Sequence, residues 1–187
     1  MIRDMSSLAE SPMTAEELEQ LSVPGKAFEL VRGRLIVREP LSSWHGRVAL
    51  RLGIRIGTYV ERHALGEVFG QDTGFQIRSN PDTVRAPDFA FIAAARASAL
   101  SRSGYLQLVP DLVAEILSPE DRPGEVLAKV ADWLDAGARL VWVIDPERFV
   151  AHIHRPDGSL SQVDRDGALD GEQVVPGFAC ALRDILE

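Results

Sequence analysis

The pattern of apolar and polar positions divides the first forty residues into a short helix and two strands. The segment "TAEELEQL" begins with Thr14, and Glu17 follows three residues later, which forms the capping box typical of a helix start. In "AFELVRGRLIVRE", apolar residues alternate with polar ones on both sides of Gly33. This alternation predicts two short strands joined by a turn at that glycine.

A long amphipathic helix is predicted next, in "SSWHGRVALRLGIRIGTYVERHALG". Ser42 or Ser43 can cap its start, and Gly66 is expected to end it. At about 100° per residue, one broad face is apolar and consists of Val48, Ala49, Leu52, Ile56, Tyr59 and Val60. A second arc holds Arg47, Arg51, Arg55 and Arg62. The helix should therefore bury one face in the core and present the other as a cationic surface.

The rest of the chain reads as strands around one more helix. The runs "GEVFGQDTGFQIR", "VRAPDFAFI", "LVPDLVAEIL" and "RLVWVID" are rich in Val, Ile, Phe and Leu, as central strands are. Between the last two, "GEVLAKVADWLDAG" has helical spacing and ends at Gly137. A hairpin, "FVAHIHRPDGSLSQV", and a closing strand in "VVPGFACAL" follow. This order predicts an α/β (α+β) fold, with a mixed β-sheet core flanked by helices.

Composition indicates one globular domain. The chain has 187 residues, of which 45% are hydrophobic, so we expect a single domain at 14–187 after an N-terminal tail at 1–13. Cys180 is the single cysteine, which excludes an internal disulfide framework and fits a reducing compartment. No apolar run approaches the ~18 residues of a membrane span. We therefore expect a cytoplasmic protein with no membrane partner.

Two acids stand alone among apolar neighbours. Asp88 lies within "RAPDFAFI" and Glu115 within "PDLVAEIL". Burying an ionised carboxylate costs several kcal/mol unless a cation replaces its water. If both acids lie on adjacent strands and face one cleft, a divalent ion such as Mg²⁺ or Mn²⁺ between them would resolve the repulsion. The alternative for each acid alone is a position at a strand end, where it caps a loop or meets an arginine.

Lys129 is a third candidate, on the helix after Glu115. Val126, Val130 and Leu134 mark the buried stripe of that helix, and Lys129 projects at its edge. A lysine there can lay its methylenes along the core and bring its ammonium to the two acids. The alternative is an exposed pair with Glu125, one turn earlier.

The ordered set of motifs resembles a known family. "PDFAF", "PDLVAEILSP" and "EVLAKVADWLDAGARLVWVIDPE" are similar to segments of the Uma-two family of restriction endonucleases, within the PD-(D/E)xK nuclease superfamily. The likeness also includes "FELVRGRL", "WHGRVALRL" and "VPGF", so it extends from about Thr14 to the C-terminus. It implies a restriction-endonuclease-like fold and a metal-dependent nuclease activity.

The resemblance also assigns roles to particular residues. It implies that Asp88 and Glu115 are the metal-binding acids of the motif. The superfamily lysine should follow the second acid by two positions, where this chain has Leu117. In the family the lysine comes from the next helix, which is the position of Lys129. Trp133 stands where the family more often has tyrosine.

Glu29 and His45 match family positions that face the cleft. By the resemblance, both are catalytic candidates, and Glu29 is a further metal ligand or a group that positions water. The residues themselves leave alternatives open. Glu29 can pair with Arg32 or Arg34. His45 can be a structural histidine or part of the helix N-terminus.

The function that these observations favour is hydrolysis of DNA phosphodiester bonds with Mg²⁺ or Mn²⁺. The net charge of −8 argues against a sequence-blind nucleic-acid coat protein but allows a local basic surface. Arg47, Arg51 and Arg55 are candidates for contacts to DNA phosphates, or they form a solvated helix face. A homodimer would match a palindromic site. The alternatives are a catalytically silent binding module and a metal-dependent hydrolase of small phosphoesters.

Overall fold

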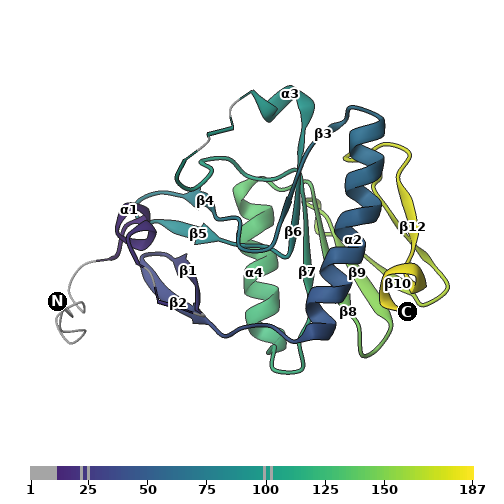
Figure 1. Ribbon diagram of the computed structural model, residues 1–187, viewed down its shortest axis with the longest axis horizontal. Helices are drawn as coiled ribbons and strands as arrows, with labels where there is room; N and C mark the ends of the chain where they lie inside the picture. Colours follow the sequence, from purple (N-terminus) through teal and green to yellow (C-terminus); the bar gives the residue numbers. More distant parts are fainter. Residues whose placement is uncertain (1–11, 22, 25, 99, 102) are drawn as a thin grey trace.

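A computed structural model describes residues 12–187, apart from 22, 25, 99 and 102 (Figure 1). Most of the predicted tail, residues 1–11, lies outside the described residues. The chain folds into two larger β-sheets and one small two-stranded ribbon, with helices packed on them. This is the mixed α/β architecture that the sequence predicts.

The large sheet has six strands in the order β10-β9-β8-β7-β6-β3. Its strands are β3 (Gly66–Gly70), β6 (Phe89–Ala93), β7 (Leu112–Ile116), β8 (Leu140–Asp145), β9 (Val150–His154) and β10 (Leu160–Asp164). Strands β7 and β8 are parallel, and the other neighbours are antiparallel. Helix α4 (Pro123–Ala136) connects the parallel pair, and Gly137 ends it with φ of 116°, as predicted.

Two helices cover opposite faces of this sheet, as Figure 1 shows. Helix α2 (Ser43–Arg62) packs on one face, and α4 packs on the other. Because successive strand residues point to opposite faces, Ala114 joins the core under α2, while Val113 joins the core under α4. The apolar face predicted for α2 is confirmed, since five of its six residues are buried and Tyr59 packs against the same core.

A second sheet of four strands lies beside α4, in the order β2-β1-β5-β4. Its strands are β1 (Ala27–Val31), β2 (Arg34–Arg38), β4 (Phe75–Arg78) and β5 (Thr83–Arg85). Helix α1 (Ala15–Glu19) packs on it through Leu18, which meets Leu30 and Val84 in a small core. The capping box between Thr14 and Glu17 is present as predicted.

Three boundaries differ from the prediction. The runs "GEVFGQDTGFQIR" and "VRAPDFAFI" each supply two strands, one to each sheet, because β3 and β6 belong to the large sheet and β4 and β5 to the small one. Helix α2 ends at Arg62 rather than near Gly66. Gly66 instead opens β3, where an added Cβ would collide with the carbonyl oxygen of Ile92.

The C-terminal region closes the core under α2. It contains β11 (Ala168–Asp170), β12 (Ala179–Ala181) and α5 (Arg183–Leu186), while α3 (Ala94–Ala97) follows β6. Cys180 is buried in this core. Among the residues that the structure describes, no helix combines the length and the apolar character needed to cross a membrane.

Candidate active site

Asp88 and Glu115 lie at the same end of the β6–β7 pair. The register pairs Phe89, the first residue of β6, with Ala114, and Asp88 and Glu115 are the next residues along the two segments. Asp88 precedes β6 rather than lying inside the strand. Glu115 contacts side chains of α4, whereas Asp88 contacts His45 of α2. The two acids therefore lie near each other at the strand ends, although their hydrogen-bond partners come from helices on opposite faces of the sheet.

The ends of these strands border a cavity of about 720 Å³ between the two sheets and the start of α2. Its lining includes Glu29, His45, Asp88, Glu115 and Lys129. The five residues predicted for the catalytic site therefore line one cavity, although they come from four different elements and one connecting segment.

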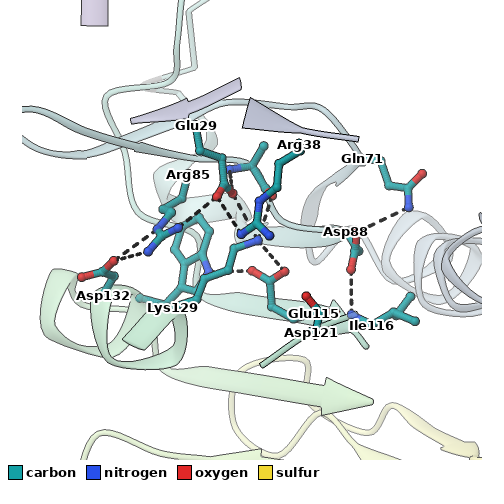
Figure 2. Close-up of polar contacts among 12 residues, drawn as sticks. Glu29, Arg38, Gln71, Arg85, Asp88, Glu115, Ile116, Asp121, Lys129 and Asp132 are labelled. Atoms are coloured by element: carbon teal, nitrogen blue, oxygen red, sulfur yellow. Dashed lines mark hydrogen bonds and ion pairs between the residues drawn. The ribbon is translucent and has the colours of Figure 1, made fainter. Parts of the chain in front are cut away.

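Two side chains of α4 donate hydrogen bonds to Glu115. Trp133 Nε1 donates to Glu115 Oε1 at 2.8 Å, and Lys129 Nζ donates to Glu115 Oε2 at 2.8 Å (Figure 2). Burial raises the pKa of Glu115, and the nearby Asp88 and Glu29 add to this effect, so the pKa reaches about 7 despite the opposing Lys129. The carboxyl group thus changes protonation near neutral pH.

The ammonium group of Lys129 contacts carboxylate oxygens from both sheets. Its ammonium lies 2.8 Å from Glu115 Oε2, 3.1 Å from Glu29 Oε1 and 3.3 Å from the carbonyl oxygen of Ala86. Burial works against the charge, but Glu115 and Glu29 outweigh it and raise the pKa of Lys129. The predicted alternative, a pair with Glu125, is not formed, and the exposed Glu125 lies 3.8 Å from Arg122 instead. Lys129 is therefore a mostly buried ammonium ion that contacts two of the acids.

Glu29 is buried and surrounded by cations. It accepts hydrogen bonds from Arg85 at 2.9 Å, from the Ala86 main-chain nitrogen at 3.1 Å and from Arg38 at 3.3 Å. Burial raises its pKa, but Lys129, Arg85 and Arg38 together outweigh burial and lower the pKa to about 2. Glu29 is therefore a permanent anion, and it pairs with none of the arginines of its own hairpin turn.

Arg85, at the end of β5, was missed by the sequence reasoning. It bridges Glu29 on β1 and Asp132 on α4, with its Nε 3.2 Å from Asp132 Oδ2. A cation between Val84 and Ala86 in an apolar run was the signal available in the sequence. Through this residue the small sheet is tied to α4 by charge as well as by packing.

Asp88 is oriented by its own set of donors. The main-chain nitrogen of Ile116 donates to Asp88 Oδ2 at 2.7 Å, and Gln71 lies 3.4 Å from Oδ1 (Figure 2). His45 Nε2 lies 2.8 Å from the carbonyl oxygen of Ile116 and 3.1 Å from Asp88 Oδ2, so this nitrogen carries the proton. Gln71, from the loop after β3, gave no signal in the sequence.

His45 also has a place in the start of α2. Its main-chain nitrogen donates to the Ser42 side chain at 3.2 Å, which confirms Ser42 as the helix cap. Burial works to lower the pKa of the imidazole, but hydrogen bonding and charge at Asp88 outweigh it and raise the pKa. The side chain therefore links the helix N-terminus to the acid at the edge of the sheet.

The fold of this chain is similar to that of a protein of known structure. A crystal structure of a protein described as "a putative nuclease belonging to DUF820", from Anabaena variabilis ATCC 29413, superposes with a TM-score of 0.80 and 20% sequence identity. The match covers 94% of this chain and 98% of that chain. At this identity the likeness establishes the fold, and the predicted restriction-endonuclease-like architecture is confirmed. No curated protein matches in sequence.

The sequence of this chain matches a family model over most of its length. The model of the Uma2 family, described as "Putative restriction endonuclease", matches residues 15–183. The chain belongs to the Uma2 family. In this Uma2 protein Leu117 occupies the position two residues after the second acid, and Lys129 on α4 brings the ammonium to Glu115 instead.

The arginines of α2 do not line the cavity of this Uma2 protein. Arg47 donates to the main-chain oxygen of Glu187, and Arg55 lies 3.6 Å from Asp184 in α5. Neither these two residues nor Arg51 line the cavity. The cationic arc of α2 thus serves, in part, to hold the C-terminal helix.

Proposed function

We propose that this Uma2 protein is a nuclease that hydrolyses DNA phosphodiester bonds with Mg²⁺ or Mn²⁺. The observation that supports the proposal is the placement of Asp88 and Glu115 in one cavity, with the Lys129 ammonium 2.8 Å from Glu115. Two acids and a lysine in one cleft provide charges of both signs for phosphoryl chemistry.

The donor set fits a hard divalent ion held by Asp88 and Glu115. Within the described part of the chain, no three His, Cys, Asp or Glu side chains form a ready-made metal cluster. Magnesium, however, is usually held by one or two carboxylates, with waters and substrate phosphates as its other ligands. When bound, such an ion lowers the pKa of a coordinated water and polarises a phosphoryl oxygen.

Glu29 is better suited to position the Lys129 ammonium than to bind the metal ion. Its two oxygens already accept three hydrogen bonds, from Arg85, Arg38 and the Ala86 main chain, and one of them also forms an ion pair with Lys129. A carboxylate in that state has little capacity for another cation. In this proposal Glu29 fixes the Lys129 ammonium, which stabilises negative charge on the reacting phosphoryl group.

The remaining residues orient the acids. Trp133 holds one oxygen of Glu115, so that the carboxylate keeps a single orientation. His45 and Gln71 do the same for Asp88 from the opposite side of the cavity. Such hydrogen bonds around a first set of ligands fix their geometry before substrate arrives.

A homodimer goes with the proposal, because a two-fold axis would present two sites to a palindromic sequence. Leu50 and Ile54 on α2 are 65% and 58% exposed and lie one turn apart. Sedimentation equilibrium tests the oligomeric state, and a monomer at all concentrations at which DNA is bound would contradict this part of the proposal.

Cleavage of supercoiled plasmid DNA in Mg²⁺ tests the central claim. Lys129→Ala should reduce the rate at least ~100-fold, as removal of a key electrostatic group does. Leu127→Ala is the matched control, because Leu127 lies on the same helix, is 59% exposed and does not line the cavity. Equal rates for wild type and Lys129→Ala would remove the lysine from the mechanism.

The same assay separates the alternatives. A catalytically silent binding module would bind DNA and leave it intact with every divalent metal. A hydrolase of small phosphoesters would cleave bis(p-nitrophenyl) phosphate and leave plasmid DNA intact. Only the proposed nuclease converts the supercoiled plasmid to nicked and linear forms.

A further inference from the structure

The charges in the cavity do not favour DNA by themselves. Among the described residues that line it, acidic side chains outnumber lysine and arginine side chains by seven to three. This excess attracts a divalent cation but repels the phosphates of DNA. A nuclease with such a cavity needs a cation at the rim to bring the backbone close.

Two of the three lining cations are already paired. Lys129 is buried and contacts Glu29 and Glu115. Lys26 is paired with Glu39, which also lines the cavity. Lys129 is thus committed to the reacting centre and Lys26 to Glu39, so neither is a ready contact for a neighbouring phosphate of the backbone.

Arg38 differs from both lysines. It is the last residue of β2, its side chain is 39% exposed, and its one recorded partner within the described chain is Glu29, at 3.3 Å. A guanidinium carries five N–H donors in a planar fork that matches phosphate oxygens. Figure 2 shows Arg38 extending toward the point where Lys129 and Glu115 meet. Most of its donors therefore remain free beside the acids.

We infer that Arg38 binds a phosphate of the DNA backbone next to the bond that is cleaved. The inference rests on the proposed nuclease function and assigns the contact to the β1–β2 hairpin, whereas the sequence suggested the arginines of α2. Arg47 and Arg55 contact the C-terminal residues, and Arg51 does not line the cavity. The DNA therefore passes over the small sheet, on the side of the cavity opposite α2.

Binding of a fluorescent DNA duplex by Glu115→Gln, which keeps the shape of the site, tests this inference. Adding Arg38→Ala should raise Kd about tenfold and reduce the slope of log K against log salt by about 0.9, the value for one phosphate contact. Arg51→Ala and Arg62→Ala are the controls. Arg62 is exposed at the end of α2 furthest from His45, and both variants should keep Kd within about twofold and the slope unchanged.

A second variant separates charge from structure. Arg38→Gln keeps a donor for Glu29 and removes the charge, so it should show the same loss of slope as Arg38→Ala. An unchanged Kd in the Arg38 variants, or a raised Kd with an unchanged slope, would overturn the assignment. If the Arg38 variants bind normally while wild type cleaves plasmid, the inference alone fails. If the parent binds no duplex and wild type cleaves nothing, the proposed function fails as well.

Discussion

Two buried acids, four residues apart at the two ends of β7, have opposite surroundings. Asp111, 2% exposed, precedes the strand and lies 2.9 Å from Arg96, 3.8 Å from Arg139 and 2.9 Å from the main-chain nitrogen of Ala93. Glu115, 7% exposed, shares its lysine with a second acid, Glu29, and lines the same cavity as a third, Asp88.

The difference separates a structural acid from a functional one. Asp111 lies beside two arginines, and both of them reach solvent. Its charge is therefore compensated, and its ion pairs stabilise the fold. Around Glu115, burial raises the pKa and the neighbouring acids in the cavity add to this effect, so the pKa reaches about 7. Burial alone therefore does not mark a site, whereas burial beside like charges in a cavity does. Four predictions test this contrast.

The largest expected effect is on cleavage. Glu115→Gln should slow plasmid cleavage in Mg²⁺ at least ~100-fold, because the variant lacks one of the two proposed metal-binding charges. Asp111→Asn, the matched isosteric change, should leave the rate within about threefold when assayed below its melting temperature. Comparable losses in both variants would break the comparison.

The second effect is on metal binding. At a Mg²⁺ concentration about 100 times Kd, the ion should stabilise the native state by about 2.7 kcal/mol, which raises Tm by about 5 °C or more for a chain of this size. Asp111→Asn should show the same rise from its own lower Tm. In Asp88→Ala the rise should disappear, and a full rise there in differential scanning calorimetry would exclude Asp88 as a ligand.

The third effect is on stability without metal. Asp111→Asn should lower the free energy of unfolding by about 2 kcal/mol, because Arg96 and Arg139 lose their shared anion but remain partly solvated. Glu115→Gln should lower it by no more than about 1 kcal/mol, since the amide oxygen keeps one of the two hydrogen bonds from Trp133 and Lys129, and the change removes a charge that burial and the nearby acids disfavour. Urea unfolding measures both, and the reverse order would contradict the assignment of roles.

The smallest effect is on the pH dependence of stability. The pKa of Glu29 falls from 4.5 to about 2, so its contribution is present above pH 4.5 and is lost as the pH falls through 2. The pKa of Glu115 rises from 4.5 to about 7, so its contribution is present below pH 4.5 and is lost as the pH rises through 7. Each slope should amount to about 1 kcal/mol per pH unit between the two pKa values of its group.

Two variants assign these slopes. Glu29→Gln should flatten only the acid slope, and Glu115→Gln should flatten only the slope between pH 4.5 and 7. Urea unfolding at a series of pH values measures both. A variant that keeps the slope assigned to its residue would show that another group carries it.

Much of the fold follows from local signals in the sequence. Residues a few positions apart along the chain determine three of its features. These are the capping box at Thr14 and Glu17, the glycine cap at Gly137 and the apolar face of α2. The prediction failed where an apolar run changed sheets. Pro87 indicates a break in "VRAPDFAFI", but the segment does not show that Arg85 ends a strand of one sheet and Phe89 begins a strand of the other, because pairing partners come from distant segments.

The candidate site was predictable where helical spacing or isolation in an apolar run singled out a residue. Lys129 was found because the stripe of α4 places it next to Trp133, and Glu115 because it interrupts a strand. The partners of these residues were not predictable. Gln71 lies in a loop, and Arg38 is one of many arginines, so only the three-dimensional arrangement brings them to the cavity.

The chain passes directly from β5 in the small sheet to β6 in the large one through Ala86–Asp88. Lys129 binds one carboxylate in each sheet, Glu29 and Glu115. The lysine therefore joins the two sheets through two ion pairs. A phosphate that draws its ammonium away from Glu29 also breaks one of these ion pairs, so substrate binding weakens the connection between the two sheets.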